Sequence, residues 1–281
     1  MNATTDWYET ERIAPGSYRI TEGIGYLPIN TYLLGDDDEW LLIDAGLGIG
    51  DLRAHAEAMA GTSPRVFLTH SHWDHVGSAH QFDDVVIHAS EQRDGVVPVD
   101  TTTRGGVDLA DTFVESWLET GSEFPDGFDP DGYDVPSVSG VETVEAGDVL
   151  EIGSTRLELL PIPGHSPGQL AALDRDAEIC YAADVLSPDG SVFAQFDDSD
   201  LEAYADAVDR LLTLREDGAF DVLATGHGEP IRGDDLSVLD RVKTALESVL
   251  AGDASPRAED DLWGPIHRYS VGDVDVVAQR S

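Results

Sequence analysis

Basic residues are scarce in this sequence of 281 residues. It holds 16 lysines and arginines against 56 aspartates and glutamates, for a formal net charge of −40, and Lys243 is the only lysine. Self-repulsion of this size destabilises a compact fold in dilute buffer, whereas molar salt shortens the Debye length to about 3 Å and screens it. The composition therefore predicts a protein of a halophile that folds in a high-salt cytoplasm, and it disfavours nucleic acid as a partner.

Long apolar runs and cysteine are also lacking. No apolar run of eighteen residues occurs, and no charged segment followed by an apolar stretch opens the chain. We therefore expect a soluble cytoplasmic protein with no membrane partner. Cys180 is the only cysteine, which excludes an intramolecular disulfide. Its apolar neighbours Ile179 and Tyr181 indicate a buried thiol that is not a nucleophile.

One short segment concentrates the residues that bind metal ions. From His70 to His75 the sequence reads His-Ser-His-Trp-Asp-His, so three imidazoles and one carboxylate fall within six residues. These are ligands that zinc accepts, and a catalytic zinc needs about three of them plus an open position. Residues two apart in an extended segment point to the same side, so His70 and His72 can bind one ion. Asp74 and His75 can then face a second ion.

Further candidate residues lie where strand-like segments end. They are His165 after residues 156–160, Asp184 at the end of 179–184, His227 after 221–224, and Asp44 at the end of 40–44. A carboxylate such as Asp184 can bridge two ions with its two oxygens. We interpret Asp44 as a group that does not bind metal but fixes the ligand loop. The other histidines considered, His55, His80, His88 and His267, are expected to have structural roles.

The pattern of apolar residues predicts an α/β fold. Strand-like segments are expected at residues 30–34, 40–44, 65–69, 85–88, 156–160, 169–173, 179–182 and 221–224. A helix is expected to begin at Gly77, another at Ser199 with a capping-box pattern, and another near Asp235. Val271, Val274 and Val276 are expected to form an edge strand or a subunit contact, which leaves a homo-oligomer open. We expect one domain over residues 1–281.

An insertion at about residues 93–140 does not fit the regular core. It contains glycine-rich polar stretches and a possible short amphipathic helix at residues 107–118. Its aromatic side chains favour packing as a lid beside the metal pocket, with Trp117 as a pocket wall. The alternative is a segment that packs away from the site and has no part in function. Trp73, between the candidate ligands, is expected at the pocket mouth. Arg93 and Arg104 would bring local positive charge.

The pattern His-x-His-x-Asp-His, followed by a distant His, Asp and His, resembles that of the metallo-β-lactamase superfamily. The resemblance covers roughly residues 6–92 and 141–232 and implies a four-layer αββα metallo-β-lactamase sandwich. It further implies two Zn²⁺ per chain, with Fe or Mn as alternatives. One ion would be held by His70, His72 and His165, the other by Asp74, His75 and His227, and Asp184 would bridge them.

The resemblance also implies the chemistry. In such a dinuclear hydrolase a metal-bridging hydroxide attacks a carbonyl of a small-molecule substrate, and Asp74 is the candidate catalytic residue that orients the hydroxide or accepts its proton. Segments such as Asp44–Gly48 and Pro163–Ser166 are most similar to the acyl-CoA thioesterase branch, with glyoxalase II-like enzymes next. A thioester is therefore the expected substrate. The alternatives are a lactonase or another ester or amide hydrolase, and, in a different class, an iron-dependent sulfur dioxygenase.

Overall fold

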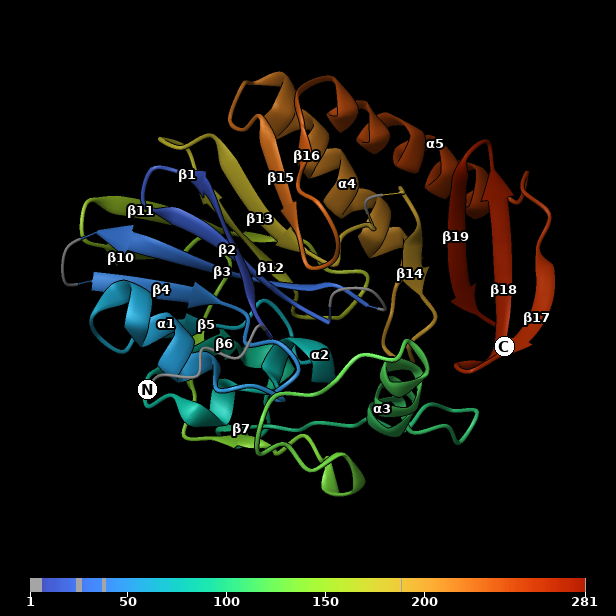
Figure 1. Ribbon diagram of the computed structural model, residues 1–281. Coiled ribbons are helices and arrows are strands. Elements are labelled where there is room, and N and C mark those ends of the chain that lie inside the picture. The colour runs from blue at the N-terminus through green and yellow to red at the C-terminus, as the bar shows by residue number, and fades with distance from the viewer. Residues whose placement is uncertain (1–6, 24–26, 37–38, 188, 281) are drawn as a thin grey trace. The chain divides into compact units, whose positions relative to one another are not determined.

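Two compact units make up the protein. The structure, a computed structural model, describes residues 7–23, 27–36, 39–187 and 189–280 (Figure 1). The first unit contains the described residues up to Thr102, together with Asp108–Val144 and Glu151–Thr155, and the second contains Thr103–Val107, Glu145–Leu150 and the chain from Arg156 onward. Within the described ranges, every helix is too short or too polar to cross a membrane.

The first unit is built on a seven-stranded sheet in the order β1-β2-β3-β4-β5-β6-β9. Its strands are β1 (Glu9–Ala14), β2 (Ser17–Glu22), β3 (Ile29–Asp36), β4 (Glu39–Ile43), β5 (Arg65–Phe67), β6 (Val85–His88) and β9 (Glu142–Val144). Strands β1 to β4 pair antiparallel, and β4, β5, β6 and β9 pair parallel. The carboxyl ends of parallel strands lie at one edge, so Asp44 after β4 and Thr69 after β5 come together there.

Helices and a small two-stranded sheet complete the first unit. They are α1 (Leu52–Ala60), α2 (Trp73–Val76) and α3 (Leu109–Glu119), the 3₁₀ turns η1 (Ala79–Gln81), η2 (Ala89–Glu91) and η3 (Pro130–Gly132), and the strand pair β7 (Val96–Val97) and β8 (Val138–Ser139). The core joins α1 and α3 to the sheet through side chains such as Ala56 and Phe113. Leu41 and Phe67 on the strands are buried as well. The near-continuous apolar character of β4 and β5 follows from this double-sided burial.

The second unit contains most of a six-stranded sheet and a four-stranded sheet. The larger, in the order β10-β11-β12-β13-β15-β16, consists of β10 (Val149–Ile152), β11 (Thr155–Pro161), β12 (Leu170–Asp174), β13 (Ile179–Ala183), β15 (Val222–Thr225) and β16 (Ile231–Arg232). The smaller, in the order β14-β19-β18-β17, consists of β14 (Val192–Ala194), β19 (Val274–Gln279), β18 (Gly264–Val271) and β17 (Arg257–Asp261). Helices α4 (Leu201–Glu216) and α5 (Val238–Leu250) and the turn η4 (Gly233–Ser237) complete it. Cys180 is buried in its core, and burial raises the pKa of the thiol to about 12, which leaves it unreactive.

The chain following the ligand segment differs from the predicted helix at Gly77. Helix α2 has only four residues and ends at Val76. The backbone then turns, because Gly77 N donates to Gly46 O at 2.7 Å and Ser78 N donates to Ala45 O at 2.9 Å. A Cβ on Gly77 would lie 2.1 Å from the carbonyl carbon of Leu47, so only glycine fits. The close approach of two loops therefore overrides the helical pattern.

Two further expectations about the second unit were wrong, a helix beginning at Ser199 and an edge strand containing Val274 and Val276. Helix α4 is capped by Asp200, whose carboxylate accepts from two backbone N–H groups of the first turn, so Ser199 lies outside the helix. Val274 and Val276 lie on β19, which is flanked by β14 and β18, and both are buried. They therefore form an inner strand, and the exposed edge of that sheet is β17, whose sequence is almost entirely charged.

Candidate metal centre

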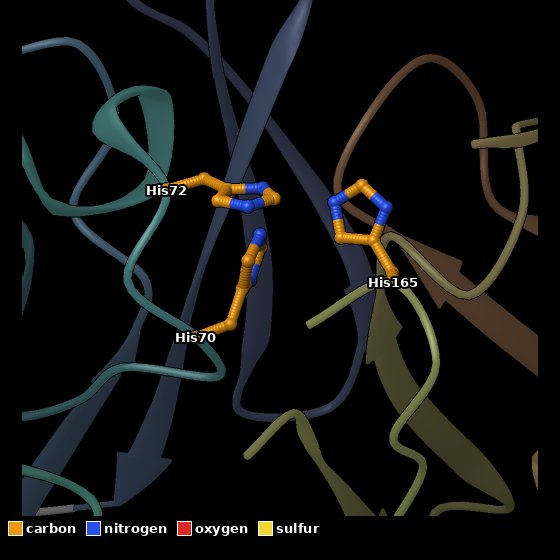
Figure 2. A group of neighbouring side chains, drawn as sticks. All are labelled: His70, His72 and His165. Atoms are coloured by element: carbon orange, nitrogen blue, oxygen red, sulfur yellow. The ribbon is translucent and has the colours of Figure 1, made fainter. Parts of the chain in front are cut away.

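The first unit places four candidate ligands on one loop. His70 and His72 come from the segment that follows β5, and their ring centroids lie 4.6 Å apart (Figure 2). Asp74 and His75 follow on α2, where the His75 ring lies 4.4 Å from that of His70 and its Nε2 lies 3.8 Å from Asp74 Oδ2. Three imidazoles and a carboxylate thus form one cluster within this unit.

Asp44 orients this cluster through contacts with Thr69 and His75. It adopts a positive φ of 61° directly after β4. Its carboxylate accepts from the backbone N–H of Thr69 at 2.8 Å and lies 2.9 Å from Nδ1 of His75. A neutral His75 that donates its Nδ1–H to this carboxylate keeps its Nε2 lone pair for a metal ion.

The hydroxyl of Thr69 connects Asp44 to His70. Thr69 Oγ1 lies 2.9 Å from the carboxylate oxygens of Asp44 and 3.0 Å from His70 Nδ1. The hydroxyl has a single hydrogen, which it donates to Asp44, so it accepts from Nδ1–H of His70. The relay fixes the tautomer in which Nε2 of His70 is the donor atom for a metal.

Glu91 was not anticipated from the sequence. It is buried at the end of η2, and its Oε2 accepts from both the backbone N–H and the hydroxyl of Ser71, at 3.1 and 2.5 Å. Ser71 stands between His70 and His72, so this carboxylate anchors the middle of the ligand loop. Only the tertiary fold brings Glu91 to Ser71, twenty residues earlier, and no local motif indicates it.

The second unit places two further candidate ligands, His165 and His227, beside the carboxylate of a third, Asp184. Asp184 Oδ2 lies 3.5 Å from His165 Nε2 and 3.3 Å from His227 Nε2. His165, on the loop after β11 (Figure 2), is oriented by its other nitrogen, which lies 2.7 Å from the carbonyl oxygen of Phe193. If that nitrogen donates to the carbonyl, Nε2 of His165 is again the metal-facing atom.

Backbone geometry holds this second cluster in place. Ala183 has a positive φ of 41° and lies where the register between β13 and β15 shifts, which sets the direction of Asp184. The hydroxyl of Tyr204 on α4 donates to the carbonyl of Asp184 at 2.8 Å. Burial, with a smaller contribution from the charge of Asp184, raises the pKa of this phenol, so it remains a donor.

A buried acid lies near the first cluster. Glu22, at the end of β2, accepts from Nε1 of Trp7 and from the backbone N–H of Leu47, both at 2.7 Å. Burial raises its pKa to about 7, the two hydrogen bonds oppose that rise, and the charge of Asp74 adds to it. The group thus titrates in the physiological range.

The donor set fits a divalent metal. Each unit offers imidazole nitrogens and carboxylate oxygens, the ligands of zinc and of related first-row ions, and three of the histidines have the other ring nitrogen next to a hydrogen-bonding oxygen. Each cluster is therefore able to bind metal.

The two tryptophans expected at the substrate pocket are buried in the first unit. Trp73 packs against Phe113 with ring centroids 6.3 Å apart, and Trp117 packs against Trp7 at 5.0 Å. They belong to an aromatic cluster that ties α3 to the sheet. Their contact with a substrate remains a prediction.

The remaining histidines make local contacts that account for them. The contacts are Thr10 Oγ1 with His55 Nε2 at 2.9 Å, Gly77 O with His80 Nδ1 at 2.8 Å, Ser90 N with His88 Nδ1 at 3.2 Å, and the Tyr269 ring with the His267 ring at 6.1 Å.

Comparison with known proteins adds family evidence. A family model described as the metallo-beta-lactamase superfamily matches residues 24–227. The chain is 28% identical to the acyl-coenzyme A thioesterase MBLAC2 of Gallus gallus over 79% of this chain and 81% of that protein. It is 26% identical to the hydroxyacylglutathione hydrolase GloC of Haemophilus influenzae over 71% of this chain and 85% of the relative.

A solved structure of a metallo-beta-lactamase family protein from Thermus thermophilus is similar with a TM-score of 0.57 and 24% identity. The match covers 88% of this chain and 85% of that one. A likeness at this level shows the fold, and together with the family model it confirms the predicted α/β class and the metallo-β-lactamase fold.

Proposed function

The chain belongs to the metallo-β-lactamase superfamily and is a metal-dependent hydrolase, and we propose that it hydrolyses acyl thioesters such as acyl-coenzyme A. The observation that carries the proposal is the likeness to an acyl-coenzyme A thioesterase over 79% of the chain. A hydroxyacylglutathione hydrolase, also a thioesterase by the chemistry of its name, is a second relative.

The acyl-coenzyme A form is favoured over a glutathione thioester by the state of the C-terminal basic residues. A glutathione enzyme needs cations for the carboxylates of the tripeptide. Here the four candidates each lie in an ion pair with acidic residues of the chain: Lys243 with Asp209, Arg257 with Glu259, Arg268 with Glu259 and Asp275, and Arg280 with Asp260. Their charge is already compensated by these acidic residues, which makes them poor partners for the carboxylates of a glutathione thioester.

For the metal, we propose that the ligands of the two units act together on two zinc ions. His70, His72 and His165 would hold one ion, Asp74, His75 and His227 the other, and Asp184 would serve both. The orientation of His70, His75 and His165 by Thr69, Asp44 and the carbonyl of Phe193 supports this assignment. Iron and manganese are the alternatives, because the donor set suits them too.

Bound divalent ions would supply Lewis-acid chemistry, lowering the pKa of water and stabilising negative charge on an oxygen. The chain's own residues would arrange that chemistry. Asp74, nearly buried on α2, offers a carboxylate that can accept a proton from the attacking water. Asp44 and Glu91 hold the ligand loop in place while the proton moves.

The test is a substrate panel with protein loaded in molar KCl with zinc, iron or manganese. Acyl-coenzyme A, S-lactoylglutathione, a lactone and a phosphodiester are compared, and we expect the zinc form to release thiol fastest from acyl-coenzyme A. Asp184→Asn should lose metal and activity together, since the substitution weakens the binding of both ions. Asp189→Asn, the same substitution at an exposed position nearby, should change neither.

Elemental analysis separates the alternatives. About two zinc ions per chain are expected for the dinuclear hydrolase. One iron per chain, with no zinc and no thiol release, would contradict the hydrolase and favour the sulfur dioxygenase. Hydrolysis of the lactone without hydrolysis of any thioester would contradict only the proposed substrate class.

A further inference from the structure

The four-stranded sheet of the second unit reaches the candidate ligand His165. Its strand β14 pairs parallel with β19, and the carbonyl of Phe193 in β14 lies 2.7 Å from Nδ1 of His165. Phe196 follows β14 by two residues. The C-terminal strands, which have no assigned role in the hydrolase, are thus connected to a metal-binding side chain.

Aromatic rings continue from this ligand to the turn between β17 and β18. The ring of Phe196 lies 4.9 Å from that of His165 with the planes at 78°, and the ring of Trp263 lies 5.1 Å from Phe196 at 79°. Such edge-to-face contacts are favourable and fix the ring positions. Phe196 and Trp263 are each only half-buried, so part of both rings faces outward.

The same turn exposes a second apolar side chain. Leu262, next to Trp263, is 38% exposed. Leu262 and Trp263 are thus adjacent large apolar residues at one turn, and apolar side chains gathered at the surface can mark a binding site. The turn is therefore a candidate for contact with an apolar ligand.

Part of the insertion fixes this turn. The hydroxyl of Thr103 donates to the carbonyl of Leu262 at 2.6 Å. Gly105 packs against Gly264 so closely that a Cβ on Gly105 would lie 3.1 Å from the nitrogen of Gly264. The backbone N–H of Trp263 donates to Asp261 Oδ1 at 2.8 Å. A turn held from both sides presents its side chains with little ordering left to lose on binding.

The charge next to the turn argues for an uncharged ligand group. Arg104 Nε lies 3.0 Å from Asp197 Oδ1, and Gln279 donates to the same carboxylate at 2.7 Å. The guanidinium is therefore compensated by an acid of the chain and gives no net attraction for an anion. The local chemistry suits an aliphatic or aromatic group.

We propose that Phe196, Leu262 and Trp263, here called the apolar shelf, bind the acyl group of the substrate and decide which acyl groups are hydrolysed. The proposal rests on the proposed thioesterase function. It assigns the C-terminal hairpin and the segment Thr103–Val107 to substrate selection, a role that the sequence pattern assigned to Trp117.

The first experiment compares kcat/KM for acetyl-, hexanoyl- and decanoyl-coenzyme A in zinc-loaded protein at molar KCl. Trp263→Ala should lower kcat/KM for the decanoyl substrate by about tenfold or more and leave kcat/KM for the acetyl substrate within about twofold, since only the longer chain has methylenes that lose burial. Trp263→Phe should recover most of the loss. Zinc content and melting temperature must match the wild type.

A matched pair of leucine variants controls for a general surface effect. Leu262→Ala should lower kcat/KM for the decanoyl substrate by about threefold or more, because the acyl chain again loses burial. Leu250→Ala, at the end of α5, removes the same side chain from a similarly exposed position, 43% against 38%, and should leave the chain-length profile unchanged. Binding of the non-hydrolysable decyl thioether of coenzyme A, measured calorimetrically, should weaken in parallel without any turnover.

Three outcomes decide the matter. Equal losses for acetyl and decanoyl substrates would overturn the acyl assignment while leaving the thioesterase standing. A loss that disappears with decanoyl-N-acetylcysteamine, which lacks the nucleotide, would also overturn it, because the shelf would then bind the adenine. Failure of the zinc-loaded wild type to cleave any thioester would instead remove the proposed function on which the shelf rests.

Discussion

Buried carboxylates in this protein have different hydrogen-bonding partners. Asp44 and Glu22 are both buried in the first unit and both accept two or more hydrogen bonds. The carboxylate of Asp44 lies beside the ring of His75, whereas the partners of Glu22 are the indole of Trp7 and the backbone of Leu47, which are neutral. Burial therefore dominates for Glu22, whose pKa rises to about 7.

The raised pKa of Glu22 predicts a pH-dependent stability. The folded value of about 7 exceeds the usual 4.5, so its contribution is complete below about pH 4.5 and is lost as the pH rises through 7. In metal-free protein at molar KCl, the wild type should lose on the order of 2 kcal/mol more unfolding free energy between pH 5.5 and 8 than Glu22→Gln does. Urea unfolding at the two pH values measures this. Equal losses in both proteins would show that Glu22 titrates normally.

At the scale of elements, the sequence was informative where periodicity or ligand chemistry is local. The strands β4, β5, β13 and β15 and the helices α4 and α5 follow from apolar patterns, and the candidate ligands were noticed because they lie at strand ends. Strand β1 was missed because its side chains are largely exposed and show no apolar alternation.

Contacts between distant segments explain the remaining errors. Helix α2 stops at Val76 because the loop around Ala45 pairs with the following residues, and Glu91 reaches Ser71 only through the fold. Neither partner is adjacent in sequence. The place of β18 and β19 could not be predicted from the sequence for a similar reason. Their sheet is completed by β14, which lies about eighty residues earlier in the chain.

One loop–helix contact yields a sharp test of how His165 is placed. Gly164 has a φ of 136°, and a Cβ there would lie 2.5 Å from Cα of Tyr204 on α4. Gly164→Ala should therefore push the loop off the helix, costing about 3 kcal/mol or more and reducing zinc binding. Gly218→Ala is the control, because its φ is 71° but nothing lies within 4 Å.

The control variant should cost only about 1 kcal/mol from backbone strain and keep its metal. Unfolding free energy and zinc content of the two proteins are the measurements. If Gly164→Ala costs no more than Gly218→Ala and binds zinc normally, the contact with Tyr204 does not position His165.

At the scale of the whole molecule, charge is the dominant unbalanced quantity. The arginines form many ion pairs with acidic partners, such as Arg53 with Glu57 and Arg175 with Glu158, yet these are exposed and each is worth little. They cannot offset a formal net charge of −40. Acidic residues therefore remain in large excess over basic ones, and the repulsion among them depends on the ionic strength.

This imbalance predicts that folding depends on salt. At molar KCl the Debye length is about 3 Å and repulsion between surface carboxylates is screened, whereas at about 10 mM it is about 30 Å and the charges of the whole chain repel one another. The melting temperature should therefore rise steeply with KCl, and dialysis into dilute buffer should unfold the protein. Sucrose at matched osmolality separates screening from general exclusion effects, because it adds no ions and should restore much less stability. A melting temperature that stays level from low to high KCl, or that sucrose raises as far as KCl does, would mean that the acidic surface is not what limits the fold.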